Sequence, residues 1–134
     1  MIFGIGHDIV DHTRIKHMLD KYGDKFINRI LTNQEQDIYH TRKDNINFLA
    51  KRFAAKEAFA KACGTGLISP INLLNISVLN DNLGKPILHL EHSINEWLKQ
   101  HHIINNFISI SDEKQYSSAF VILETSPSDS SIKT

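Results

Sequence analysis

The sequence has only one cysteine, Cys63, and no apolar run of about eighteen residues. A single thiol cannot form an intrachain disulfide, a redox pair or a cysteine-rich metal site, so a reducing compartment is expected. The N-terminus lacks the basic region and long apolar run of a secretory signal. We therefore expect a cytoplasmic protein with no membrane partner.

The sequence also has no net charge, because fifteen Lys and Arg balance fifteen Asp and Glu. The charges are unevenly placed. Residues 12–61 contain eleven basic and six acidic side chains, whereas residues 1–11 and 62–134 are acidic overall. An acidic partner would meet the first half of the chain, although a solvated basic helix face would have the same composition. Eight histidines are present without HExxH spacing, and we interpret them as surface residues.

The order of the apolar patterns predicts an α+β fold, with helices gathered first and mainly hairpin strands afterwards. The length suits one domain, residues 1–124, followed by a polar tail, residues 125–134, that we expect to be disordered. Asp24 is expected to cap the second helix, and Thr32 with Glu35 has the spacing of a capping box for the third. Strands are predicted near residues 2–10, 74–78, 88–91, 107–111 and 118–124, and helices near residues 15–22, 25–31, 33–39, 46–63 and 93–102.

The first predicted strand has Gly4 and Gly6 on one face, which indicates that another element packs closely there. Asp8 is expected to end this strand. An aspartate in that place is usually a turn or cap residue, but it is also a possible ligand. The glycines lack the spacing of a dinucleotide fingerprint, so we do not interpret them as one.

The long helix predicted at residues 46–63 has apolar side chains on two sides, so we expect it to lie between other elements. Glu57 falls within one apolar stripe. A carboxylate there requires a cation, a metal or a proton, because burying it alone costs several kcal/mol. An ion pair between Glu57 and Lys61, spaced i, i+4, also accounts for the pattern. The helix should stop at Gly64, and the loop Gly64 to Gly66 either only ends the helix or also admits a phosphate.

Four segments resemble the holo-acyl-carrier-protein synthases, the small bacterial phosphopantetheinyl transferases. The segments are GIGHDIVDHTRI at residues 4–15, RFAAKEAFAKACGTG at residues 52–66, NDNLGKP at residues 80–86 and YSSAFVIL at residues 116–123. The resemblance extends from residue 2 to residue 124, and two long motifs in the correct order make it specific. It implies a fold in which N-terminal helices and one long central helix pack on a mostly antiparallel sheet.

The resemblance implies transfer of the 4'-phosphopantetheine arm of coenzyme A to a serine of apo acyl carrier protein. Adenosine 3',5'-bisphosphate is released, and the reaction supports fatty acid biosynthesis. The family uses Mg²⁺, and its ligands fall on Asp8 and Glu57. Glu57, directly or through a metal-bound water, becomes the candidate that deprotonates the serine. Lys61 becomes the candidate that neutralises or protonates the leaving group.

The rest of the site is also carried over from the family. Around coenzyme A the resemblance places Arg52 and Lys56 at the phosphates, and Gly64, Thr65, Gly66, Lys85 and Pro86 around the nucleotide. The docking face for the acidic carrier comprises Arg14, Met18, Lys21 and Arg29. Lys85 and Pro86 also fit a plain hairpin turn. Family members are trimers with active sites at subunit boundaries, and no nucleic-acid partner is implied.

One segment departs from many family members, which have a histidine in the motif SISH, whereas this chain has Ser111, Asp112 and Glu113. Other members carry the same Asp-Glu pair, so no histidine role is transferred and Asp112 is only a neighbour of the site. Two rival functions remain: an adaptor that binds an acidic helix without chemistry, and a metal-dependent hydrolase of nucleotide pyrophosphates. The joint presence of Asp8, Glu57 and Lys61 favours an enzyme over the adaptor, whereas the hydrolase would use similar residues and release free phosphopantetheine without a carrier.

Overall fold

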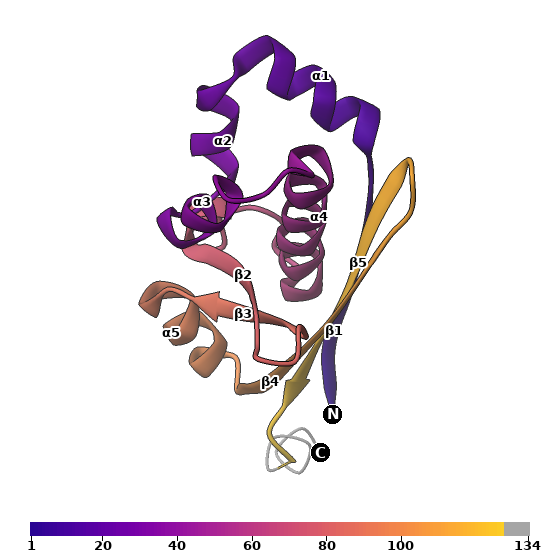
Figure 1. The fold of residues 1–134 in the computed structure, drawn as a ribbon. Helices are drawn as coiled ribbons and strands as arrows, with labels where there is room; N and C mark the ends of the chain where they lie inside the picture. Colours follow the sequence, from indigo (N-terminus) through magenta and orange to yellow (C-terminus); the bar gives the residue numbers. More distant parts are fainter. Residues whose placement is uncertain (128–134) are drawn as a thin grey trace.

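A computed structural model of the chain describes residues 1–127. One long helix, α4, lies between a three-stranded antiparallel sheet on one side and smaller elements on the other (Figure 1). The elements are β1 Ile2–Asp11, α1 His12–Tyr22, α2 Asp24–Ile30, α3 Asn33–Tyr39, α4 Asn45–Cys63, the 3₁₀ helix η1 Leu73–Asn75, β2 Ile76–Asn80, β3 Pro86–Leu90, α5 His92–Gln100, β4 Ile103–Asp112 and β5 Tyr116–Thr125. This architecture confirms the predicted α+β class.

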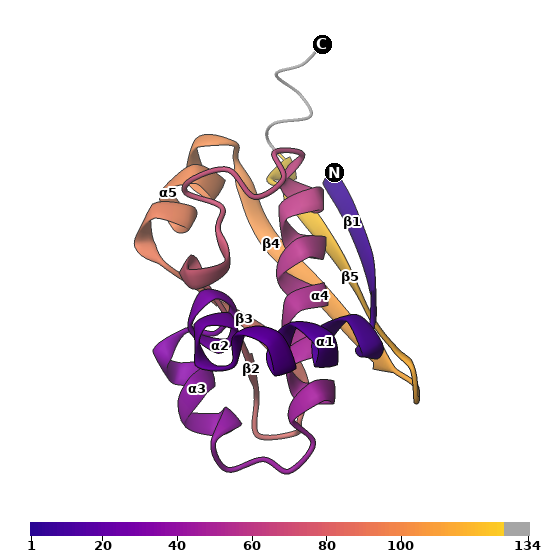
Figure 2. The ribbon, with the colours of Figure 1, turned by 90° about the horizontal axis from the view of Figure 1, so that it is seen from above.

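The main sheet has the strand order β1-β5-β4, and β2 with β3 forms a separate antiparallel hairpin. Helix α4 runs along the sheet, and α1 crosses over it on the side away from the strands (Figure 2). Twelve of the nineteen residues of α4 are buried, including Phe48 and Ala50, which lie on opposite sides because two residues turn a helix by about 200°. The prediction that this helix is enclosed by other elements is confirmed.

Glycines set the distance between α4 and β1. A Cβ atom at Gly4 would collide with the carbonyl oxygen of Ala62, and one at Gly6 would collide with that of Ala58. The predicted close packing at these glycines is therefore confirmed. Because side chains alternate along a strand, Asp8 lies on the same face of β1 as Gly4 and Gly6 and points towards α4.

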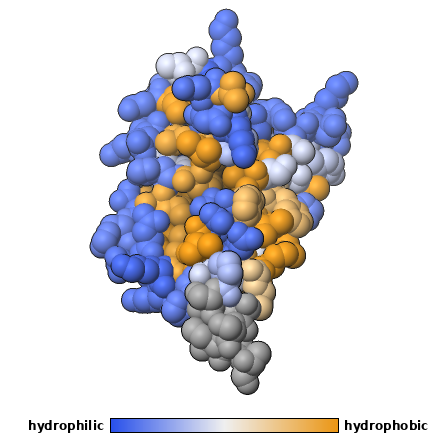
Figure 3. Space-filling view, turned by 90° about the horizontal axis from the view of Figure 1, so that it is seen from below, coloured by the Kyte–Doolittle hydropathy of each residue, from blue (hydrophilic) through white to orange (hydrophobic). Residues whose placement is uncertain are grey.

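The opposite face of the main sheet is apolar and exposed. Ile5 and Phe107 both lie opposite Ile122 in the strand register, and Ile9 and Phe120 continue this surface along β1 and β5. These side chains are among the exposed large apolar residues of the chain. Figure 3 shows hydrophobic surface forming a band between hydrophilic flanks on one face of the molecule. A face of this kind is typical of an interface.

Several local predictions need correction. β1 does not end at Asp8 but continues to Asp11, whose carboxylate caps α1 by accepting a bond from the Thr13 amide. Asp24 is the first residue of α2 and makes no cap bond; Gly23 holds the cap position. The segment around Leu74 is a 3₁₀ turn rather than strand, because Asn72 caps it.

Thr125, the first residue of the predicted C-terminal tail, is part of a strand. It belongs to β5, and its amide and hydroxyl donate to the carbonyl of Met1. The prediction of disorder for residues 125–134 falls mainly on residues 128–134, which lie outside the described part of the chain.

Candidate active site

Asp8 and Lys61 meet between β1 and α4. The Lys61 ammonium donates to Asp8 Oδ1 at 2.9 Å and to the backbone carbonyl of His7 at 3.0 Å. The Asp8 side chain is 18% exposed and that of Lys61 is 51% exposed, so the pair lies at the edge of the packed interface. Two residues that are distant in sequence are thus brought to one place, as the resemblance implies.

Glu57 lies one turn before Lys61 on α4 and is partly exposed. Burial raises the pKa of its carboxyl, and the negative charge of Asp8 raises that pKa further, while Lys61 and Arg14 oppose the shift. Lys61 forms its ion pair with Asp8, and the structure shows no ion pair between Glu57 and Lys61. The i, i+4 alternative for Glu57 is therefore not observed, and its carboxylate remains available to a cation.

The donor set of this site fits Mg²⁺. Mg²⁺ binds in proteins through one or two carboxylates and completes its shell with water and substrate phosphates. Asp8 and Glu57 supply two carboxylates whose charges repel each other, and a cation between them would relieve that repulsion. Within residues 1–127 there is no cluster of three or more His, Cys, Asp or Glu that could form a closed protein cage. The arrangement therefore suits a metal that arrives with other ligands.

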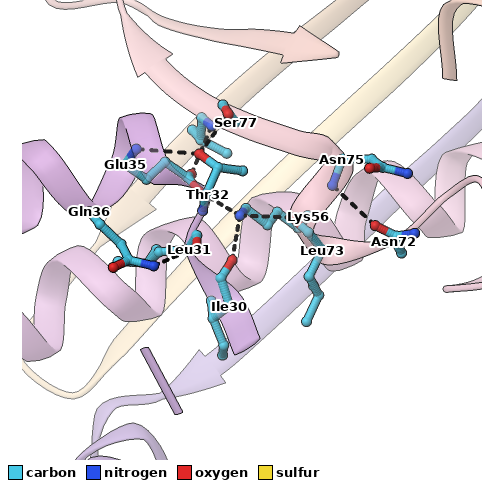
Figure 4. A network of polar contacts seen from close by, with 11 residues as sticks. Ile30, Leu31, Thr32, Glu35, Gln36, Lys56, Asn72, Leu73, Asn75 and Ser77 are labelled. Carbon is cyan, nitrogen blue, oxygen red and sulfur yellow. Dashed lines mark hydrogen bonds and ion pairs between the residues drawn. The ribbon is translucent and has the colours of Figure 1, made fainter. Parts of the chain in front are cut away.

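Lys56 is not at this site. Its side chain is fully buried, and its ammonium donates to Glu35 Oε1 at 2.5 Å and to the carbonyls of Ile30 and Leu73 at 2.5 and 3.0 Å (Figure 4). Burial lowers the pKa of Lys56, and Glu35 opposes that shift. All three N–H groups are used, so none faces a phosphate. This corrects the expectation that Lys56 binds coenzyme A.

Arg52 lies on a different side of α4 from Glu57, since five residues along a helix correspond to a turn of about 140°. Its side chain is buried, with only 5% exposed, and its guanidinium stacks 3.7 Å above the Phe48 ring. One long hydrogen bond reaches Asn80 at 3.4 Å, and Nε has no partner. Burial lowers the pKa of Arg52 to about 10. A buried guanidinium with unused donors fits an anion.

The remaining coenzyme candidates border two turns. Gly64 ends α4 in the left-handed conformation, and Gly66 also has a positive φ. Between them, the hydroxyl of Thr65 donates to the carbonyl of Gly66 within the same turn. Lys85 donates its amide to Asp81 in the β2–β3 turn, and Pro86 begins β3. These segments have the turn geometry expected of them, and their contacts to a nucleotide stay a prediction.

A groove between α1, α2 and α4 contains three of the four predicted docking residues. This cavity of about 520 Å³ is lined by Arg14, Met18 and Arg29, together with Lys25, Phe26 and Phe53, among others. Arg14 stacks over Phe53 at 5.8 Å. Lys21 does not line the groove; it lies over the ring of Tyr22 on the same helix.

The residues that sequence reasoning missed are the apolar floor of this groove and the cation Lys25. Phe26 of α2 and Phe53 of α4 line this floor. Helical periodicity gives no sign that the floor is open, because the opening is formed where three helices meet. The predicted neighbour Asp112 lies at the end of β4 and accepts a hydrogen bond from Asn47 of α4 at 2.6 Å.

Comparison with known proteins decides the family. A sequence profile described as the 4'-phosphopantetheinyl transferase superfamily matches residues 4–121. The chain belongs to this superfamily. The match includes both carboxylates and Lys61, so the site described above lies inside the region shared with other phosphopantetheinyl transferases.

Relatives identify the type of phosphopantetheinyl transferase. A holo-[acyl-carrier-protein] synthase of Nitrosomonas eutropha is 47% identical over 124 residues, which cover 92% of this chain and 99% of that protein. The crystal structure of holo-[acyl-carrier-protein] synthase from Neisseria meningitidis has a TM-score of 0.91 at 43% identity and covers 93% of this chain and 100% of that one. A synthase from Bacillus anthracis, solved in complex with CoA (3',5'-ADP), has a TM-score of 0.80 at 42% identity, covering 94% and 99%. The chain is thus an enzyme of the holo-acyl-carrier-protein synthase type.

Proposed function

We propose that this enzyme transfers 4'-phosphopantetheine from coenzyme A to a serine of apo acyl carrier protein in a Mg²⁺-dependent reaction that releases adenosine 3',5'-bisphosphate. The observation that carries the proposal is the meeting of Asp8, Glu57 and Lys61 between β1 and α4. A relative solved with coenzyme A supports the co-substrate. The product would serve fatty acid biosynthesis.

The chain's own residues would divide the chemistry among them. Asp8 and Glu57 would hold Mg²⁺, which when bound offsets charge on the pyrophosphate of coenzyme A. Glu57 would accept the serine proton, directly or through a water, and the raised pKa of its carboxyl makes it a better base than an ordinary glutamate. Lys61 would neutralise or protonate the leaving phosphate.

The free chain holds Lys61 against Asp8. A cation at Asp8 would compete with that ion pair and free the ammonium of Lys61 for the leaving group. The same competition predicts that removing the ammonium strengthens metal binding, which makes the assignment of Lys61 testable apart from catalysis.

Coenzyme A would be bound by Arg52, with Gly64, Thr65, Gly66, Lys85 and Pro86 around the nucleotide. Arg52 and Glu57 lie on different sides of α4. We propose the homotrimer that the family implies, with active sites at subunit boundaries. The exposed apolar face formed by Ile5, Ile9, Phe107 and Phe120 supports such an assembly.

The carrier would dock on α1 and α2. Arg14 and Arg29 at the groove, with Lys21 nearby, supply positive charge, and Met18 with Phe53 supplies an apolar floor. Acyl carrier proteins are acidic, so this charge would speed the encounter and lose its effect as salt is added. Lys25, at the same groove, joins the proposed docking residues.

The described residues contain no helix able to span a membrane. The proposal places the enzyme in the cytoplasm, because its one cysteine, Cys63, is buried, unpaired and needs no oxidising compartment. Residues 1–124 would act as a single domain.

The test is the intact mass of an apo acyl carrier protein after incubation with the enzyme, coenzyme A and Mg²⁺, beside an identical sample that contains a chelator. A gain of one phosphopantetheine group in the metal sample alone is expected. Cleaved coenzyme A with an unmodified carrier would instead identify a pyrophosphate hydrolase. An unmodified carrier with intact coenzyme A would contradict transfer to that carrier.

A further inference from the structure

Lys56 and Glu35 form an ion pair that is fully enclosed by protein, with both side chains 0% exposed. Among the described residues no other ion pair has both partners buried. Taking two charges out of water is unfavourable, so such a pair adds little stability compared with apolar side chains of the same size. Its presence beside the active site therefore suggests a role other than stability.

The hydrogen bonds of the pair converge from separate segments. The Lys56 ammonium donates to Glu35 of α3, to the carbonyl of Ile30 at the end of α2, and to the carbonyl of Leu73 in η1. The second oxygen of Glu35 accepts from the Val78 amide of β2 at 2.9 Å. Figure 4 shows the ammonium at the centre of this network. One ion pair thus connects α4 to four other elements.

Three of the joined segments adjoin parts of the proposed site. Ile30 follows Arg29 of the docking groove, β2 leads into the turn before Lys85, and Lys56 precedes Glu57 on α4. A second bond runs parallel to the first, because the hydroxyls of Thr32 and Ser77 lie 2.7 Å apart and also join the α3 start to β2.

We propose that the Lys56–Glu35 pair is a positioning device that holds the β2–β3 hairpin and the α2–α3 corner at a fixed place relative to Glu57. The inference rests on the proposed function, since it concerns the coenzyme and carrier contacts assigned above. Apolar surfaces can slide past one another with little loss of area, whereas an ammonium bonded to three oxygens fixes three directions. A fully satisfied polar network of this kind makes a core rigid and specifies one arrangement.

The test separates positioning from stability with a single variant that leaves one charge of the pair and a double variant that removes both. Lys56→Met leaves the Glu35 carboxylate buried with only the amides of Thr32 and Val78 and no cation, and should lower the thermal midpoint strongly. Glu35→Gln/Lys56→Met removes that charge as well and should recover most of the lost midpoint. We expect this double variant to bind coenzyme A about tenfold more weakly and to lose about 10–100-fold in kcat/KM, because coenzyme contacts and Glu57 are no longer held together. KM for coenzyme A should change more than kcat.

The matched control is Ile94→Ala, which removes a fully buried side chain of α5 away from the site. This variant should lose stability and keep wild-type KM and kcat. If the double variant fails to fold, the isosteric Glu35→Gln variant decides, since it loses the bond to the Val78 amide or the bond to Lys56. The KM of this variant for coenzyme A should rise at least about threefold. A stabilising osmolyte should not restore the activity of any of these variants.

Equilibrium binding of coenzyme A is measured for every variant alongside transfer. Wild-type affinity and wild-type kinetics in a folded neutral variant would overturn the positioning role. If the wild type binds coenzyme A but transfers nothing, the proposed function fails by itself, and the affinities of the variants still decide the role of the pair.

Discussion

The ammonium of Lys61 lies 2.9 Å from the carboxylate of Asp8, and not on Glu57, its neighbour one helical turn away. Asp8 therefore has a paired cation, whereas the Glu57 carboxylate has no ion-pair partner among residues 1–127 and carries a raised pKa. The site is an unequal pair of carboxylates with one cation, the Lys61 ammonium, which is paired with Asp8. Its response to metal, pH and mutation follows from this inequality.

Removing the Lys61 ammonium should weaken catalysis and strengthen metal binding. In Lys61→Met, kcat should fall about 10²-fold or more, as expected for a lost proton donor. Asp8 also loses the cation that competes with Mg²⁺. The thermal midpoint rises as Mg²⁺ is added, and in the variant half of this rise should be reached at a lower Mg²⁺ concentration. Lys61→Arg keeps the charge and is the control. An unchanged Mg²⁺ dependence in Lys61→Met would show that the two cations do not compete.

Glu57 should destabilise the metal-free enzyme at neutral pH. The pKa of its carboxyl is higher in the folded state than in the unfolded state. Glu57 therefore contributes favourably to the free energy of unfolding below its unfolded pKa of about 4.3, and this contribution is lost as the pH rises through its folded pKa. Glu57→Gln should therefore be more stable than wild type in chelator above that range and equal to it at low pH. Urea unfolding at acidic and neutral pH measures this. If the difference in free energy of unfolding between the two proteins is the same at acidic and at neutral pH, the raised pKa is contradicted.

Arg14→Glu should impair carrier binding selectively. The reversed charge lies at the groove and should raise KM for the carrier about tenfold, with KM for coenzyme A nearly unchanged. Lys16→Glu makes the same charge change on α1, but Lys16 pairs with Asp20 on an exposed side of the helix. It should have a smaller effect, and both effects should shrink with salt. Equal increases in the two Michaelis constants for Arg14→Glu would refute the docking assignment.

Gly6→Ala should disrupt the packing of α4 against β1. The added methyl group would collide with the backbone carbonyl of Ala58, which cannot rotate away. The free energy of unfolding should fall by about 3 kcal/mol or more, the upper end for an overpacked position. Gly84→Ala, in open space with a positive φ, should cost only about 1 kcal/mol. Denaturant unfolding compares the two, and a smaller loss at Gly6 would contradict the close contact.

The elements and the positions of the two candidate carboxylates, Asp8 and Glu57, were predictable because their signals are local. Thr32 and Glu35 have the spacing of a capping box, and the structure contains that box. Alternation along β1 puts Asp8 on the face of the two glycines, and the family motifs supply its partner on α4.

What the sequence could not predict are the contacts made across long separations. Glu35 also binds Lys56 and Val78, which lie 21 and 43 residues away. Periodicity selected Glu57 as the enclosed charge of α4, yet Lys56 is the one that is fully buried. Because α4 is covered on two sides, its apolar stripes do not show which polar side chain reaches solvent.

The most direct test of the account is the amount of phosphopantetheine gained by the carrier and of adenosine 3',5'-bisphosphate released, measured together for wild type and Glu57→Gln. The account predicts equal amounts of both products from the wild type in Mg²⁺. It predicts a rate at least about 10²-fold lower from the folded Glu57→Gln variant. A variant that transfers at nearly the wild-type rate, or bisphosphate released without modified carrier, would contradict it.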